Sequence, residues 1–332
     1  MRRTTKLAGI ALSLTTALAM SACGGQQDRA AAGAGADESS CDAGTGRVNI
    51  ATGNSTGVYY VVGGGLAQLI NDKTELQATA AETGASVQNI QQLVAGDYDI
   101  GFSLADTASD AVEGKGDFEK PEDVSTIGRI YSNYTQVVVQ ADAGIDSVAD
   151  FKGKRISTGS PQSGTEVIAR RLIEAAGLQK GDVKAQRLDL TKTIDGMKDG
   201  SLDGFVWSGG LPTPGVTDLF TSKGDDVKFI DVTPLLPKMQ EVNPVYEKAV
   251  IPADTYNLDQ DVPTIAVPNL LMVRNDMADN VACALTTLML ENKDTLVRVH
   301  PAAGELSLET AGETGPVPVH PGSKRALENL QS

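Results

Sequence analysis

Residues 47–106 decide the fold: RVNIATGNSTGVYYVVGGGLAQLINDKTELQATAAETGASVQNIQQLVAGDYDIGFSLAD. Short β-prone runs at 47–51, 76–82 and 98–106 alternate with two amphipathic runs at 59–72 and 87–97. This β–α–β–α–β order predicts a parallel sheet with crossover helices. Each loop that leads from a strand into a helix is rich in Gly, Ser and Thr, and such strand ends are where open α/β sheets bind ligands.

A second block of the same kind follows. The β-prone run at 126–142 is longer than a typical strand, and the alternation restarts over 147–210. A second long β-prone run occupies 262–276 and helices follow from 278 to 299. Two long strands that cross between two α/β lobes predict a hinged, bilobed binding protein with its ligand in the cleft.

We therefore expect an α/β fold of the bilobed periplasmic-binding-protein type II kind. One lobe is predicted from residues 47–137 together with 256–332, and the other from residues 138–255.

Composition excludes several classes of protein. The 332 residues carry a formal net charge of −15, and only 4% are aromatic, so a nucleic-acid binder is not expected. Two His, in His300-Pro301 and His320-Pro321, lack nearby Cys or acid at metal-ligand spacing, so we expect a structural role for them, no metal and no cofactor.

The N-terminus has the features of an export signal. Basic residues (Arg2, Arg3, Lys6) precede an uncharged stretch at 7–20, and Met20-Ser21-Ala22-Cys23 resembles a bacterial lipobox. We predict a signal peptide over 1–22, lipidation (palmitate) of Cys23 and a flexible tether over 23–46. The alternative is an ordinary secretory signal with a chance Cys. Export leaves Cys41 and Cys283 to form one disulfide, the alternative being two free thiols.

Three Gly/Ser/Thr loops carry the binding chemistry. They are Thr52–Tyr60, Thr83–Ser86 and Ser160–Glu166, each placed before a predicted helix. Backbone N–H groups at a helix N-terminus attract an anion, and the hydroxyl groups add further donors. The alternative for each loop taken alone is plain N-capping.

The chain resembles the TAXI-type solute-binding subunits of TRAP transporters. The similar stretches span nearly all of 47–325 and include ATGNSTGVYY, TGASVQNIQQLVAGDYDIGFSLADTA, GKRISTGSPQSGTEVIARRLIEAAGL, DGMKDGSLDGFVWSGGLPTPG and PVPVHPGSKRALE. The resemblance implies a non-enzymatic, extracytoplasmic protein. The predicted lipid on Cys23 would anchor it to the outer face of the cell membrane. The resemblance further implies a small carboxylate ligand, glutamate-like or a 2-oxo dicarboxylate, that is delivered to an ion-gradient-driven TRAP permease.

The family pattern is not followed everywhere. Tyr131-Ser132-Asn133-Tyr134 and Val206-Trp207-Ser208-Gly209-Gly210 differ from its usual residues, which leaves the ligand's identity open. The residues that we expect to contact the ligand are Asn54, Ser55, Thr56, Gly57, Tyr59, Thr83, Gly84, Ser86, Ser103, Asp106, Tyr131, Ser160, Ser163, Gly164, Thr165, Trp207 and Ser208.

Three alternatives remain open. The chain could serve an ABC transporter or a sensor system, because the fold and pocket would be the same. An exported hydrolase on a similar fold is the third, but the sequence has no paired acids suited to acid–base chemistry and few His. We expect a monomer.

Overall fold

A computed structural model describes residue 37 and residues 40–332 of the chain. The predicted signal peptide, Cys23 and most of the predicted tether lie outside the described residues. Over these residues the backbone forms a ten-stranded sheet whose main path runs β2-β1-β3-β10-β4-β7-β5-β6. No helix in the described part of the chain is both long and apolar enough to cross a bilayer.

The first half of the molecule begins as the sequence predicts. Three strands pair in parallel, with β1 in the middle, and helices follow each of them. The bounds are β1 Gly46–Ala51, α1 Val58–Lys73, β2 Leu76–Ala81, α2 Ser86–Ala95, β3 Ile100–Leu104 and α3 Ala105–Glu113.

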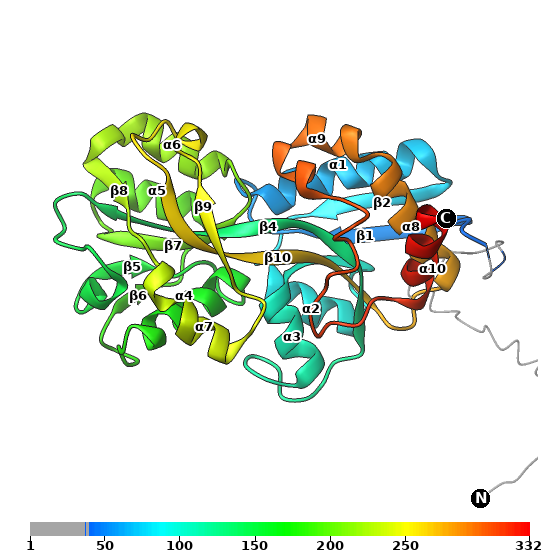
Figure 1. The fold of residues 1–332 in the computed structure, drawn as a ribbon, viewed down its shortest axis with the longest axis horizontal. Coiled ribbons are helices and arrows are strands. Elements are labelled where there is room, and N and C mark those ends of the chain that lie inside the picture. Colours follow the sequence, from blue (N-terminus) through cyan, green and yellow to red (C-terminus); the bar gives the residue numbers. More distant parts are fainter. Residues whose placement is uncertain (1–36, 38–39) are drawn as a thin grey trace, which may run out of the picture.

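Two long antiparallel strands connect this half to the second one (Figure 1). They are β4, Val124–Gln140, and β10, Val262–Arg274. β10 also pairs with β3, while the far end of β4 pairs with β7, so one sheet runs through both halves. The expected pair of crossing strands is therefore present, within a mixed α/β sheet.

The second half holds the elements between the two long strands. Its strands are β5 Arg155–Ser157, β6 Lys184–Gln186, β7 Gly204–Gly209, β8 Val227–Phe229 and β9 Glu247–Ile251. Its helices are η1 Val148–Phe151, α4 Gly164–Ala175, α5 Leu190–Asp199, α6 Pro214–Lys223, η2 Gly224–Asp226, η3 Thr233–Leu235, α7 Leu236–Val242 and η4 Ala253–Thr255.

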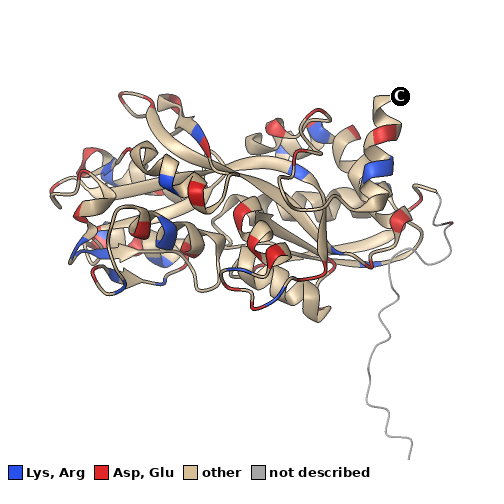
Figure 2. Ribbon diagram, turned by 60° about the horizontal axis from the view of Figure 1, so that its bottom comes forward, with Lys and Arg blue, Asp and Glu red and all other residues tan. Residues whose placement is uncertain are grey.

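The C-terminal helices return to the first half, beside α1 and β4 (Figure 1). They are α8 Asp279–Glu291, α9 Lys293–Val299, η5 Pro301–Glu305 and α10 Pro321–Gln331. Acidic and basic residues are interspersed over the elements of both halves (Figure 2).

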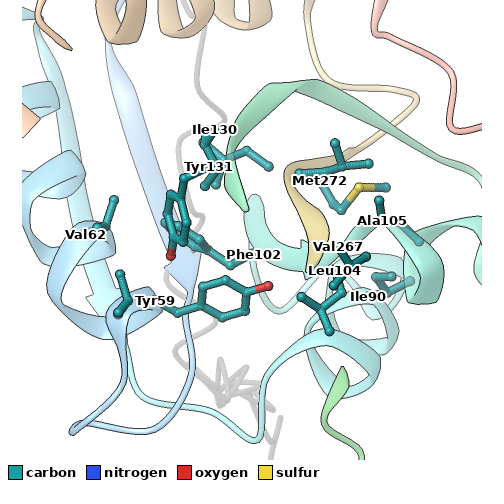
Figure 3. Packing of buried hydrophobic residues seen from close by; sticks show 14 of the residues in the cluster. Tyr59, Val62, Ile90, Phe102, Leu104, Ala105, Ile130, Tyr131, Val267 and Met272 are labelled. Atoms are coloured by element: carbon teal, nitrogen blue, oxygen red, sulfur yellow. The ribbon is translucent and has the colours of Figure 1, made fainter. Parts of the chain in front are cut away.

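The hydrophobic core follows the sheet from one half into the other. Its main cluster includes Tyr59, Phe102 and Tyr131 beside β3 and β4, where the three rings approach one another (Figure 3). A second cluster around α5, α6 and β7 includes Phe205 and Trp207. Most of this burial is aliphatic, as expected from the few aromatic residues.

Two local expectations need correction. The third strand ends at Leu104 rather than 106, and Asp106 belongs to α3. The end of the predicted tether is also anchored: Arg325 Nη2 donates to Ser40 O at 2.8 Å, Asn280 Nδ2 donates to Asp42 O at 2.8 Å, and Ala43 is buried. A disulfide joins Cys41 to Cys283 in α8, so this segment packs on the first half instead of hanging free.

Candidate ligand-binding cavity

A cavity of about 30 Å³ lies between the two halves. One water-sized sphere needs roughly 10–15 Å³, so the space holds only a few atoms in this conformation. Its lining comes from the loops that open α1, α2 and α4 and from β3, β4 and β7. The lining residues are Gly53, Asn54, Gly57, Val58, Tyr59, Gly84, Ala85, Ser86, Leu104, Asn133, Ser163, Gly164, Thr165, Trp207, Ser208 and Gly209.

Three helix N-termini meet at this cavity. α1, α2 and α4 contain 16, 10 and 12 residues, and their N-caps are Gly57, Ala85 and Ser163. The first backbone N–H groups of a helix have no acceptor inside it, and the helix dipole places partial positive charge there. In α2 and α4 the N–H group of the third residue already has an acceptor: Gln88 N donates to Gln162 O, and Glu166 N donates to Ser163 Oγ. The N–H groups before them remain to bind an anion.

Ser208 adds to the cavity a hydroxyl group that forms no hydrogen bond with the described residues. The residue is 5% exposed and lines the cavity, and its Oγ has no hydrogen-bond partner among the residues that the structure describes. Its backbone N–H donates to Thr165 Oγ1 at 3.2 Å, which leaves the Thr165 hydroxyl hydrogen free to donate elsewhere. Because a buried, unpaired hydroxyl costs stability, Ser208 points to a bound ligand.

A chain of polar groups fixes the wall between Tyr59 and Ser208. The Tyr59 hydroxyl donates to Asn269 Oδ1, Asn269 Nδ2 donates to Asn133 Oδ1 at 2.7 Å, and Asn133 Nδ2 donates to Ser208 O at 3.1 Å. Burial raises the pKa of Tyr59 above its ordinary value, so the phenol stays neutral. Each member is paired, and the wall is therefore preorganised.

Small residues bring the walls together. A Cβ on Gly57 would lie 3.2 Å from Trp207 Cζ2, so the indole closes the cavity against the start of α1. Ala85 holds a φ of 85°, a region that favours glycine, immediately before α2. Strain of this kind persists where the surrounding structure holds it, and binding sites are common places for it.

Hydrogen bonds across the cleft hold the two halves in contact. Asn54 and Ser160 are linked side chain to side chain at 3.2 Å, and Leu190 N donates to Asn54 Oδ1 at 3.1 Å. The bond from Gln88 N to Gln162 O, at 3.0 Å, is a third link. The two halves are therefore in direct contact beside the cavity.

The lining contains ten of the residues expected from the sequence: Asn54, Gly57, Tyr59, Gly84, Ser86, Ser163, Gly164, Thr165, Trp207 and Ser208. Ser163 also caps α4, as the alternative for its loop proposed. Gly53, Val58, Ala85, Leu104, Asn133 and Gly209 were not expected. For Asn133 the sequence contains one indication of a site residue, a polar amide side chain within a long β-prone run.

Seven expected residues lie outside the lining, and most of them bond to the protein instead. Thr83 Oγ1 donates to Asn89 Oδ1 at 2.6 Å, Ser103 Oγ donates to Leu104 O at 3.0 Å, and Ser160 bonds to Asn54. Ser55 is exposed, and Thr56 Oγ1 lies 3.3 Å from Thr191 Oγ1.

Asp106 and Tyr131 are the other two. Asp106 is fully buried in α3, where its carboxylate accepts hydrogen bonds from Arg171 and Tyr246. Tyr131 packs edge-on behind Tyr59 with ring centroids 6.5 Å apart (Figure 3). It lines a neighbouring apolar space, and within the described part of the chain its buried hydroxyl has no hydrogen-bond partner.

Both histidines act as caps. His300 Nδ1 accepts from Ala302 N, and His320 Nδ1 accepts from Gly322 N, each at 3.2 Å. Across residue 37 and residues 40–332, His, Cys, Asp and Glu form no group of three or more that could hold a metal ion.

Solved structures show the same fold. The chain matches a protein of Bordetella bronchiseptica RB50 at 18% identity and a TM-score of 0.56, over 86% of this chain and 98% of that one. It matches a binding protein component of an ABC phosphonate transporter from Pseudomonas aeruginosa at 13% identity and a TM-score of 0.51, over 77% and 78%. Because the family model for NMT1-like proteins matches residues 50–329, the chain belongs to the NMT1-like family.

Proposed function

We propose that this protein is a non-enzymatic solute-binding protein that captures a small carboxylate between its two halves. The observation that carries the proposal is the meeting of three helix N-termini with the unpaired Ser208 hydroxyl in one buried cavity. A carboxylate would accept hydrogen bonds from these N–H groups and from the hydroxyl groups of Ser208 and Thr165.

The two halves would act as hinged lobes. We propose lobe boundaries at 47–137 with 256–332, and at 138–255, with β4 and β10 as the hinge. Opening would break the links of Asn54 to Ser160 and of Gln88 to Gln162, and the ligand would enter. Contacts from both lobes to one ligand then favour the closed form.

The membrane partner has two candidates. The motif resemblance favours a TRAP permease driven by an ion gradient. The fold match to an ABC transporter's binding component favours an ABC transporter, and the solved structures support this second candidate better. Uptake by membrane vesicles that contain the partner separates them: an ATP requirement identifies the ABC system, and a requirement for an ion gradient identifies the TRAP system.

We also propose that the protein works outside the cytoplasm on a lipid anchor at Cys23. The sequence of residues 1–23 supports this, and the disulfide of Cys41 with Cys283 fits an oxidising compartment. Mass spectrometry of the N-terminal peptide tests the anchor, since an unmodified N-terminus would exclude it.

Calorimetric titration of the purified chain with small carboxylates tests the binding function. Ser208→Ala should weaken binding about 5- to 30-fold, because one hydrogen bond to a charged group is lost, a loss of about 1–2 kcal/mol. Ser201→Ala, in an exposed turn, is the matched control and should bind as the wild type does. Absence of binding by every carboxylate, after any retained ligand is removed, would overturn the proposal.

A further inference from the structure

All sixteen residues that line the cavity have uncharged side chains. The acids closest in sequence to the lining are engaged elsewhere. Asp106 is held by Arg171 and Tyr246, and Glu166 accepts from Gln162 N and pairs with Arg187. Glu82 accepts from Ser55 N at 2.8 Å on the exposed side of the loop. The cavity therefore offers partial positive charge from three helices and no carboxylate.

This distribution of charge discriminates between kinds of carboxylate. One carboxylate can be neutralised by the helix N-termini. An ammonium group in the same buried space would meet those same positive ends without a carboxylate partner, which is strongly unfavourable. A second carboxylate would have no cationic side chain within the lining.

The walls also limit the ligand's size. Trp207 is 9% exposed, and its Nε1 donates to Thr213 Oγ1 at 3.3 Å, which orients the ring. The ring lies against Gly57, and Tyr59, whose hydroxyl is fixed by Asn269, also lines the cavity. The volume of about 30 Å³ fits a compact ligand.

From the charge and the size of the cavity we propose that the ligand is a short monocarboxylate whose other substituents are uncharged. Trp207 is the residue that sets its maximum length. The inference rests on the proposed function and narrows it. It differs from the glutamate-like acids and 2-oxo dicarboxylates that the sequence resemblance implies, because each of those brings a further charge into an uncharged lining.

A titration with five probes tests the inference on the full chain. L-Lactate and L-alanine form a matched pair, since they differ by a hydroxyl group in place of an ammonium group. Pyruvate, 2-oxoglutarate and L-glutamate complete the set. We expect L-lactate or pyruvate to bind at least roughly 100-fold more tightly than L-alanine, L-glutamate and 2-oxoglutarate, since an unpaired buried charge is costly.

The outcomes separate the inference from the proposed function. Tightest binding of L-alanine, L-glutamate or 2-oxoglutarate would overturn the inference and leave the carboxylate-binding function standing. Binding of none of the five acids, nor of any other carboxylate, would overturn both.

Trp207→Ala tests the size limit separately. The variant should gain affinity for 2-oxohexanoate relative to pyruvate by about 10-fold or more, because removal of the indole lengthens the cavity. Trp207→Phe, which keeps an aromatic wall, should stay close to the wild-type ratio. An unchanged ratio in a folded Trp207→Ala variant would overturn the role of Trp207.

Discussion

Gly164 shows how a single residue limits the distance between the two halves. It is the first residue of α4 in the second half, and it meets Leu104 and Ser86 of the first half across the cavity. A Cβ here would lie 2.5 Å from Leu104 Cδ1 and 2.6 Å from Ser86 Oγ. These distances are too short for real atoms, so the halves could not approach as closely.

Gly164→Ala should therefore weaken ligand binding by about 10-fold or more while it changes the thermal unfolding of the ligand-free protein little, because alanine is a good helix former. Calorimetric titration and thermal unfolding measure the two effects. Gly64→Ala is the control: its Cβ meets no atom within 4 Å, and it should keep full affinity and gain about 0.5–1 kcal/mol of stability. Wild-type affinity in Gly164→Ala would contradict this account.

At the scale of elements, α3 and α4 are joined by a buried cluster of charges. Arg171 of α4 donates to Asp106 Oδ2 at 2.8 Å and to Asp110 Oδ2 at 2.6 Å, both in α3. It also donates to Tyr246 Oη at 3.0 Å. Burial lowers the pKa of Arg171, but the nearby carboxylates and Tyr246 raise it more, so the net pKa lies above its ordinary value. Arg171 thus keeps its charge and joins the halves behind the cavity.

Arg171→Met should cost about 3–5 kcal/mol of unfolding free energy, because it leaves two buried carboxylates without their cation. Urea denaturation measures this. Arg170→Met is the neighbouring control: Arg170 is 44% exposed and pairs with Asp117 at the surface, so its loss should cost at most about 1 kcal/mol. Equal losses for the two variants would show that the cluster contributes no more than a surface pair.

The sequence predicts elements well where the signal is local. The strands and helices of residues 47–100 follow from the hydrophobic period. Eight of the ten expected lining residues follow from the three Gly/Ser/Thr loops, and the other two, Trp207 and Ser208, lie in β7. α3 was missed because apolar, buried Ala105 and Ala108 continue the pattern of the strand before it. Asn133 and the cluster around Arg171 could not be predicted, because their partners lie more than 60 residues away in the sequence and meet only in the folded sheet.

At the scale of the whole molecule, two histidines attach the C-terminal segment to the rest of the fold. His300 Nε2 lies 3.0 Å from Pro212 O, across the boundary between the halves, and His320 begins α10 beside α8. Burial lowers the pKa of both residues, while Pro212 O partly offsets this for His300 and Asp279 does so for His320. The folded protein therefore holds both imidazoles neutral.

Stability should consequently fall on mild acidification. An unfolded histidine binds a proton near pH 6.5, and the folded residues resist it to lower pH, so the unfolded state gains protons first. The unfolding free energy should be constant above about pH 7.5, decline as pH falls through about 6.5, and level off below the folded pKa values. Aspartates with lowered pKa, such as Asp203 beside Arg155, lose their contribution only below about pH 4, outside this window. Urea denaturation at pH 7.5, 6.5 and 5.5 measures the decline. The double variant His300→Gln, His320→Gln should be less stable at pH 7.5 but nearly flat across the range, and an unchanged slope would assign the decline to other groups.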